Sequence, residues 1–86
     1  MIVGVNRVCA HEGKQYHVQA EDLGVEQAVF EVRVYVDGAV LFRKKVPYAE
    51  ILQKALPKIE QDEALNVFME KTIHTVQAAI LKGKIA

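Results

Sequence analysis

The fold is decided by residues 30–38, which read Phe-Glu-Val-Arg-Val-Tyr-Val-Asp-Gly. Apolar residues stand at every second position, which is the period of a strand with one buried face. Asp37-Gly38 follows at once, and this dipeptide favours a two-residue type I′ hairpin because both central residues need positive φ. The stretch therefore predicts a strand over about 27–36, a tight turn, and a returning strand over about 39–46.

The residues before this hairpin alternate in the same way. They predict one strand ending near Ala10 that includes Val3 and Val5, and another over about 15–22. The polar residues 11–14, with Gly13, reverse the chain between them, and residues 22–24 make the next break. Together the four strands form an antiparallel meander with one apolar and one polar face, so that another element must cover the apolar face.

The second half of the chain supplies this cover, because the apolar period changes to about 3.6 after Pro47. Pro57 separates a short helix over about 48–56 from a long helix over about 59–82 that ends at Gly83. The long helix carries one apolar stripe, made of Leu65, Phe68, Met69, Thr72, Ile73, Val76, Ala79 and Ile80. The prediction is an α+β fold, a four-stranded antiparallel meander followed by a short and a long helix on one face, in a single domain over 1–86 with the sheet in 1–46 and the helices in 47–86.

The composition indicates the class of protein and its cellular compartment, but it does not indicate a function. The 86 residues include 11 Lys and Arg and 11 Asp and Glu, and 51% are apolar, which is typical of a globular domain and not of a disordered or polyanion-binding chain. Cys9 is the single cysteine, so no internal disulfide forms. No run reaches the roughly 20 apolar residues of a membrane span, and polar residues interrupt the start where a secretion signal would be apolar. We expect a cytoplasmic protein.

The most site-like residues lie in the second predicted strand. His17, Gln19 and Glu21 project from one face, and Asp22 ends the strand, so we expect these four to form a partner-binding surface. A metal-assisted hydrolase that uses His17 and Glu21 is an alternative, although the spacing matches no strong metal motif.

Cys9 allows a nucleophile hypothesis in which His11 or His17 is the base. No oxyanion site or orienting group accompanies it, and a lone cysteine in an apolar strand is more often part of the core. The sequence predicts no catalytic residue, no metal and no cofactor.

A second alternative is single-stranded nucleic acid binding across the last two strands. Bases would stack on an aromatic side chain while cations follow the phosphates, and the candidate residues are Arg33, Tyr35, Arg43 and Lys45. A net charge of zero gives little long-range attraction for phosphates, and charges on a last strand also protect an exposed edge from aggregation. Nucleic acid is therefore not the expected partner.

The long helix exceeds what a small sheet needs for cover, since about 24 residues extend about 36 Å. Its outer side also carries apolar residues, namely Val67, Ala78 and Leu81. Scattered apolar side chains are normal on a surface, but they also suit contact with a second copy through this helix or through an edge strand. We expect a homodimer.

One longer pattern resembles a known family. Residues 16–24 read Tyr-His-Val-Gln-Ala-Glu-Asp-Leu-Gly, followed by a hairpin ending at Gly38, basic residues before Tyr48, Met69-Glu70, and a helix closing at Gly83. This order is similar to a small bacterial domain family of unassigned function, over about residues 14–84.

The chain departs from that family at three positions. Ala20 stands where the family has threonine, Asp37 replaces the first glycine of the hairpin, and Ile73 stands where a histidine is frequent. The resemblance implies a stand-alone or accessory domain of bacterial proteins and transfers no catalytic residue. With the missing catalytic constellation, it favours a non-enzymatic protein-interaction module.

Overall fold

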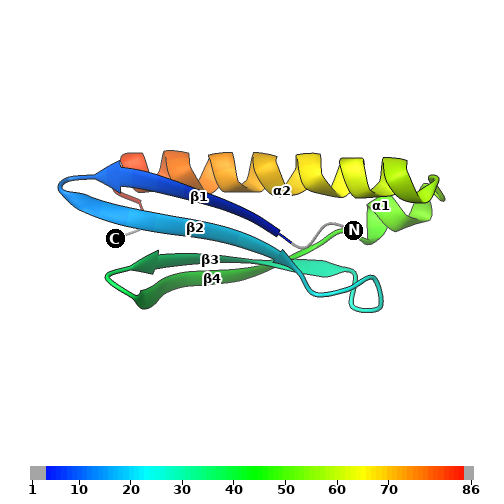
Figure 1. The fold of residues 1–86 in the computed structure, drawn as a ribbon, viewed down its shortest axis with the longest axis horizontal. Coiled ribbons are helices and arrows are strands. Elements are labelled where there is room, and N and C mark those ends of the chain that lie inside the picture. Colours follow the sequence, from blue (N-terminus) through cyan, green and yellow to red (C-terminus); the bar gives the residue numbers. More distant parts are fainter. Residues whose placement is uncertain (1–3, 85–86) are drawn as a thin grey trace.

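A four-stranded antiparallel sheet with two helices forms the molecule, in the order β1 (Gly4–His11), β2 (Lys14–Asp22), β3 (Val29–Val36), β4 (Ala39–Pro47), α1 (Ala49–Gln53) and α2 (Lys58–Leu81) (Figure 1). The computed structural model describes residues 4–84. The strands are neighbours in sequence order, so the predicted α+β meander is confirmed. Residues 1–3, part of which the sequence assigns to the first strand, and residues 85–86 lie outside the described residues.

Two tight turns hold the hairpins in register. Asp37 and Gly38 have φ values of 54° and 78°, and Glu12 and Gly13 have 51° and 80°. Positive φ at both central residues is the type I′ geometry that the right-handed twist of paired strands favours. The predicted Asp37-Gly38 turn is therefore confirmed, and the reversal at residues 11–14 is made by Glu12 and Gly13.

Two predicted elements are shorter than expected. β3 starts at Val29 and not at Gln27, because Gln27 and Ala28 donate their backbone N–H groups to the carbonyl of Gly24 at 3.2 and 3.0 Å and so close a turn. α1 ends at Gln53 and not at Leu56, because Ala55 adopts φ 51° and leaves the helix. α2 lies within one residue of its predicted bounds: it ends at Leu81, and Gly83, whose φ is 72°, follows the C-cap residue Lys82.

The core lies between α2 and the inner face of the sheet, which is the face toward the helix. It combines side chains from three strands, the β4–α1 junction and both helices: Val5, Tyr16, Val18, Ala20, Phe30, Val32, Val34, Tyr48, Ile51, Leu65, Met69, Ile73, Val76 and Ile80. The ring of Phe30 packs edge-on against Phe68 at 5.3 Å and stacks on Tyr48 at 6.5 Å. These contacts join β3 to α2 and to the residue that precedes α1.

α2 does not cover the sheet evenly. It packs mainly against β1 and β2 (Figure 1). The Arg7 guanidinium of β1 also donates to Glu70 Oε1 of α2 at 2.6 Å. Phe42 and Val46 of β4 are consequently half-buried at the side of a groove of about 370 Å³ between β4 and α2. The opposite, outer face of the sheet is not covered by either helix.

Candidate interaction surface on the sheet

The outer face of the sheet presents rows of side chains that cross all four strands. One row joins Val8, His17, Tyr35 and Val40, which are paired in turn across β1, β2, β3 and β4; we call it the apolar row. Val8 is 58% exposed and Val40 is 44% exposed. A strip made of exposed Val8, His17 and Val40 and half-buried Tyr35 therefore crosses the full width of the sheet.

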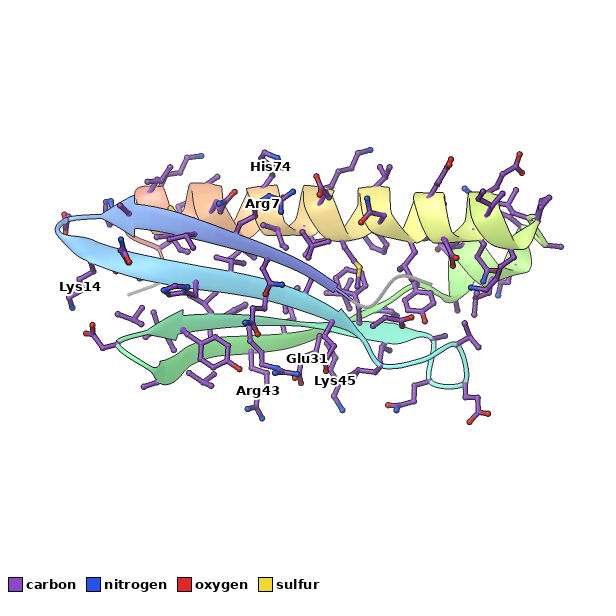
Figure 2. The ribbon with its side chains drawn as sticks, viewed as in Figure 1. Arg7, Lys14, Glu31, Arg43, Lys45 and His74 are labelled. Carbon is purple, nitrogen blue, oxygen red and sulfur yellow. The ribbon has the colours of Figure 1, made fainter. Side chains whose placement is uncertain are left out.

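Two further rows lie beside the apolar row toward the other end of the strands. The next row is polar and consists of Asn6, Gln19, Arg33 and Arg43. The third contains Gly4, Glu21, Glu31 and Lys45. Figure 2 shows Glu31, Arg43 and Lys45 together on β3 and β4, on the other side of the molecule from His74 of α2.

Arg33 connects the polar row to both of its neighbouring rows by hydrogen bonds. Its Nε donates to Glu31 Oε1 at 2.6 Å, one terminal nitrogen donates to Glu21 Oε1 at 3.0 Å, and the other donates to the Tyr35 hydroxyl at 3.2 Å. Glu21 and Glu31 are directly paired across β2 and β3, and like charges in this arrangement repel unless a cation lies between them. Arg33 is that cation, so its planar group fixes three neighbours in place.

The protonation states follow from this network. The hydrogen bond from Arg33 lowers the pKa of Glu31, and although burial of the carboxyl raises it, the charges of Arg33, Arg43 and Lys45 lower it further. The bonds to Tyr35 and Glu31 raise the pKa of Arg33 further above its already high ordinary value. Glu31 is the one charged residue of the described chain that is buried, and it stays ionised at neutral pH.

The structure brings three of the four predicted contact residues together. His17, Gln19 and Glu21 lie in successive rows of the outer face. Asp22 lies apart from them, because its Oδ1 accepts the Tyr48 hydroxyl at 2.6 Å and the Gly24 N–H at 3.0 Å beside the core. Burial, together with the Asp22 bond, raises the pKa of Tyr48, so the hydroxyl remains a donor and Asp22 anchors the start of α1.

All four residues of the nucleic-acid alternative lie on the outer face, where Arg33 and Arg43 are direct partners. Arg33, however, already donates to Glu31, Glu21 and Tyr35. Arg43 and Lys45 are exposed, while the neighbouring Lys44 lines the groove between β4 and α2. Two acidic side chains accompany the cations, so the face has little excess positive charge to attract phosphates.

The residues considered for catalysis are separated. Cys9 is paired with Tyr16 on the inner side of the sheet and packs against the core, whereas His17 projects from the outer face. His11 lies 3.8 Å from Glu12. Four positions separate His17 from Glu21 along an extended strand, which places their Cα atoms about 13 Å apart. Among residues 4–84, no three His, Cys, Asp or Glu side chains form a group that would hold a metal ion.

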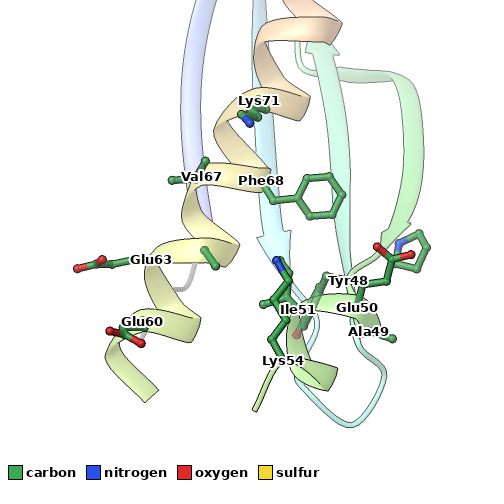
Figure 3. A pocket seen from close by; sticks show the side chains of 12 residues that line it. Tyr48, Ala49, Glu50, Ile51, Lys54, Glu60, Glu63, Val67, Phe68 and Lys71 are labelled. Atoms are coloured by element: carbon green, nitrogen blue, oxygen red, sulfur yellow. The ribbon is translucent and has the colours of Figure 1, made fainter. Parts of the chain in front are cut away.

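Two features are not predictable from the sequence: the apolar row, and a groove between the two helices. Val8 is assigned to a strand, but its partner across the sheet depends on the register, which a single sequence leaves open. The groove between α1 and α2 has a volume of about 930 Å³ (Figure 3). Phe68 of α2 and Tyr48 both line it, together with charged residues from both helices.

Comparison with known proteins gives no relative: no family model matches the chain, and neither the curated proteins nor the solved structures contain a match. The family resemblance described above therefore rests on its residues alone. Neither helix of the described chain combines the length and the hydropathy that crossing a bilayer requires.

Proposed function

We propose that this protein is a non-enzymatic protein-interaction module that binds a partner protein through the outer face of its sheet and works as a homodimer. The apolar row carries the proposal. Two exposed valines flank His17 and Tyr35 on a strip that crosses all four strands. Contiguous exposed apolar and aromatic side chains are typical of protein contact sites, where tyrosine often contributes much of the binding energy.

The polar row and the third row beside it supply the specificity of this contact. Gln19 offers amide donors and an acceptor, and Glu21 is exposed at the side of the network around Arg33. Because Arg33 already holds Glu21 and Tyr35, both side chains are ordered before a partner arrives, which reduces the entropy lost on binding. The free thiol of Cys9 fits a reducing, cytoplasmic setting.

A photo-crosslinking amino acid at position 17 tests the proposal in the source cell. We expect it to capture a defined protein partner, and the same group at Glu26, in the loop before β3, not to do so. Val8→Asp should then reduce binding of the purified partner at least tenfold, because it places a charge in the apolar row. Val25→Asp is the matched control, since Val25 is 54% exposed but lies in the loop between β2 and β3.

Single-stranded nucleic acid is the outcome that would replace this proposal. In that case a labelled oligonucleotide should bind more weakly as salt rises, and Arg43→Ala with Lys45→Ala should reduce the salt slope by about 2, one for each phosphate that is no longer neutralised. Position 17 would then crosslink to nucleic acid and not to protein.

A further inference from the structure

The surface of α2 opposite the core carries a regular stripe. Val67, Lys71, His74, Ala78 and Leu81 recur at alternating steps of four and three residues and are all exposed; we call them the α2 outer stripe. Val67 is 52% exposed and Leu81 is 55% exposed. His74 projects away from the sheet in Figure 2, on the side of α2 opposite its buried residues Leu65 and Val76. Steps of four and three residues are the spacing of a helix that packs lengthwise against another helix.

The charges along α2 are complementary to themselves in one orientation. Exposed Glu60 and Glu63 lie near the start of the helix, and exposed Lys82 and Lys84 follow its end. Figure 3 shows Glu60, Glu63 and Val67 on the same side of α2, where all three also border the groove between α1 and α2. A second α2 running in the opposite direction brings the lysines of one copy to the glutamates of the other, whereas a parallel copy places like charges together.

The stripe also fixes the register of such a pair. Val67 and Leu81 are each seven residues from His74, so a twofold axis at His74 sets Val67 of one copy against Leu81 of the other. The small side chain of Ala78 leaves room for the aliphatic stem of Lys71 near the axis. Lys82 then lies within one helical turn of Glu63 of the second copy. Polar residues at the centre weaken such a pair but select one register over its alternatives.

We infer that a second copy of this chain binds along the α2 outer stripe, antiparallel and with its twofold axis at His74. This inference rests on the homodimer part of the proposed function and names its surface. The outer face of the sheet stays open in this dimer, because α2 and that face lie on opposite sides of the molecule. Each dimer would therefore present two copies of the apolar row to its partners.

Light scattering at rising protein concentration provides the test. The wild-type mass should rise from 9.6 kDa toward twice that value. Val67→Asp should weaken dimerisation at least tenfold, while Val25→Asp and Val8→Asp leave it unchanged. Glu63→Lys and Lys82→Glu should each weaken the dimer, and the double variant should restore it to within about threefold, because the two charges are exchanged.

A short bis-maleimide crosslinker measures the register directly. In a Cys9→Ala background, His74→Cys should crosslink efficiently, because the two copies meet at the axis. Glu60→Cys should not crosslink, because the two residues 60 would lie about 42 Å apart along the antiparallel helices. Efficient crosslinking at both positions would overturn the antiparallel arrangement.

The experiments distinguish a failure of the homodimer from a failure of the α2 outer stripe as its surface. A wild-type protein that stays at 9.6 kDa at high concentration overturns both the homodimer and this inference. A dimer that survives Val67→Asp overturns the α2 outer stripe as its surface and leaves the homodimer standing. Neither result bears on partner capture through the apolar row.

Discussion

At the residue scale, the outer face of the sheet depends on one guanidinium. Arg33 lies between two carboxylates that would otherwise repel each other across neighbouring strands, and it also reaches the Tyr35 hydroxyl of the apolar row. The residue that holds Glu21 and Glu31 thus also orients Tyr35, the aromatic side chain proposed to contact a partner. If the proposed contact is correct, Arg33 links the stability of this face to its recognition of a partner.

The buried carboxylate gives this network a pH dependence. The pKa of Glu31 is lowered below 4.5 in the folded protein, chiefly by the Arg33 hydrogen bond. Folding therefore gains from the ionised form above the pKa of the unfolded chain, and this gain is lost as pH falls through the lowered pKa.

We predict that Glu31→Gln lowers the melting temperature at pH 7, and that the difference from wild type shrinks near pH 3. Thermal unfolding followed by circular dichroism at both values measures this change. Glu26→Gln is the control in an exposed loop and should change little at either pH. An equal loss at both pH values would show that Glu31 contributes by packing and not by charge.

At the element scale, local chemistry predicts much of the fold. Asp37-Gly38 and the alternation before it specify a hairpin within ten residues, and the structure has it there. The start of β3 is not predictable in this way, because backbone bonds to Gly24 decide it.

The candidate site is less predictable than the fold. Alternation places His17, Gln19 and Glu21 on one face, but their cross-strand neighbours depend on a register that includes an irregularity between Val34 and Tyr35.

Ala55 is the element-scale feature with a direct test. It is exposed and adopts φ 51° after α1, a conformation that costs an L-residue about 1–2 kcal/mol and glycine almost nothing. We predict that Ala55→Gly stabilises the protein by about 0.5–1 kcal/mol in urea unfolding, the gain being reduced by the greater freedom of glycine in the unfolded chain. Gly38→Ala is the converse control: its φ is 78° with open space around the added carbon, so it should destabilise by about 1 kcal/mol. A destabilising Ala55→Gly would contradict the assigned backbone conformation.

At the scale of the whole molecule, α2 covers β1 and β2 better than β4. Truncating a core side chain should therefore cost more stability under α2 than at β4. α2 packs mainly on β1 and β2, so Ile73 is fully buried while Phe42 of β4 is half-buried at a groove.

Ile73→Ala removes a buried side chain from a closed core and should cost about 3 kcal/mol. Phe42→Ala opens a site that water already reaches, and we predict a loss of about 1–1.5 kcal/mol, because only part of its apolar surface is buried on folding. Urea unfolding of the two variants at one protein concentration, with light scattering to fix the association state, measures the difference. Equal losses would mean that β4 is as well covered as β2, and a second chain over the groove, not α2, would then have to supply that cover.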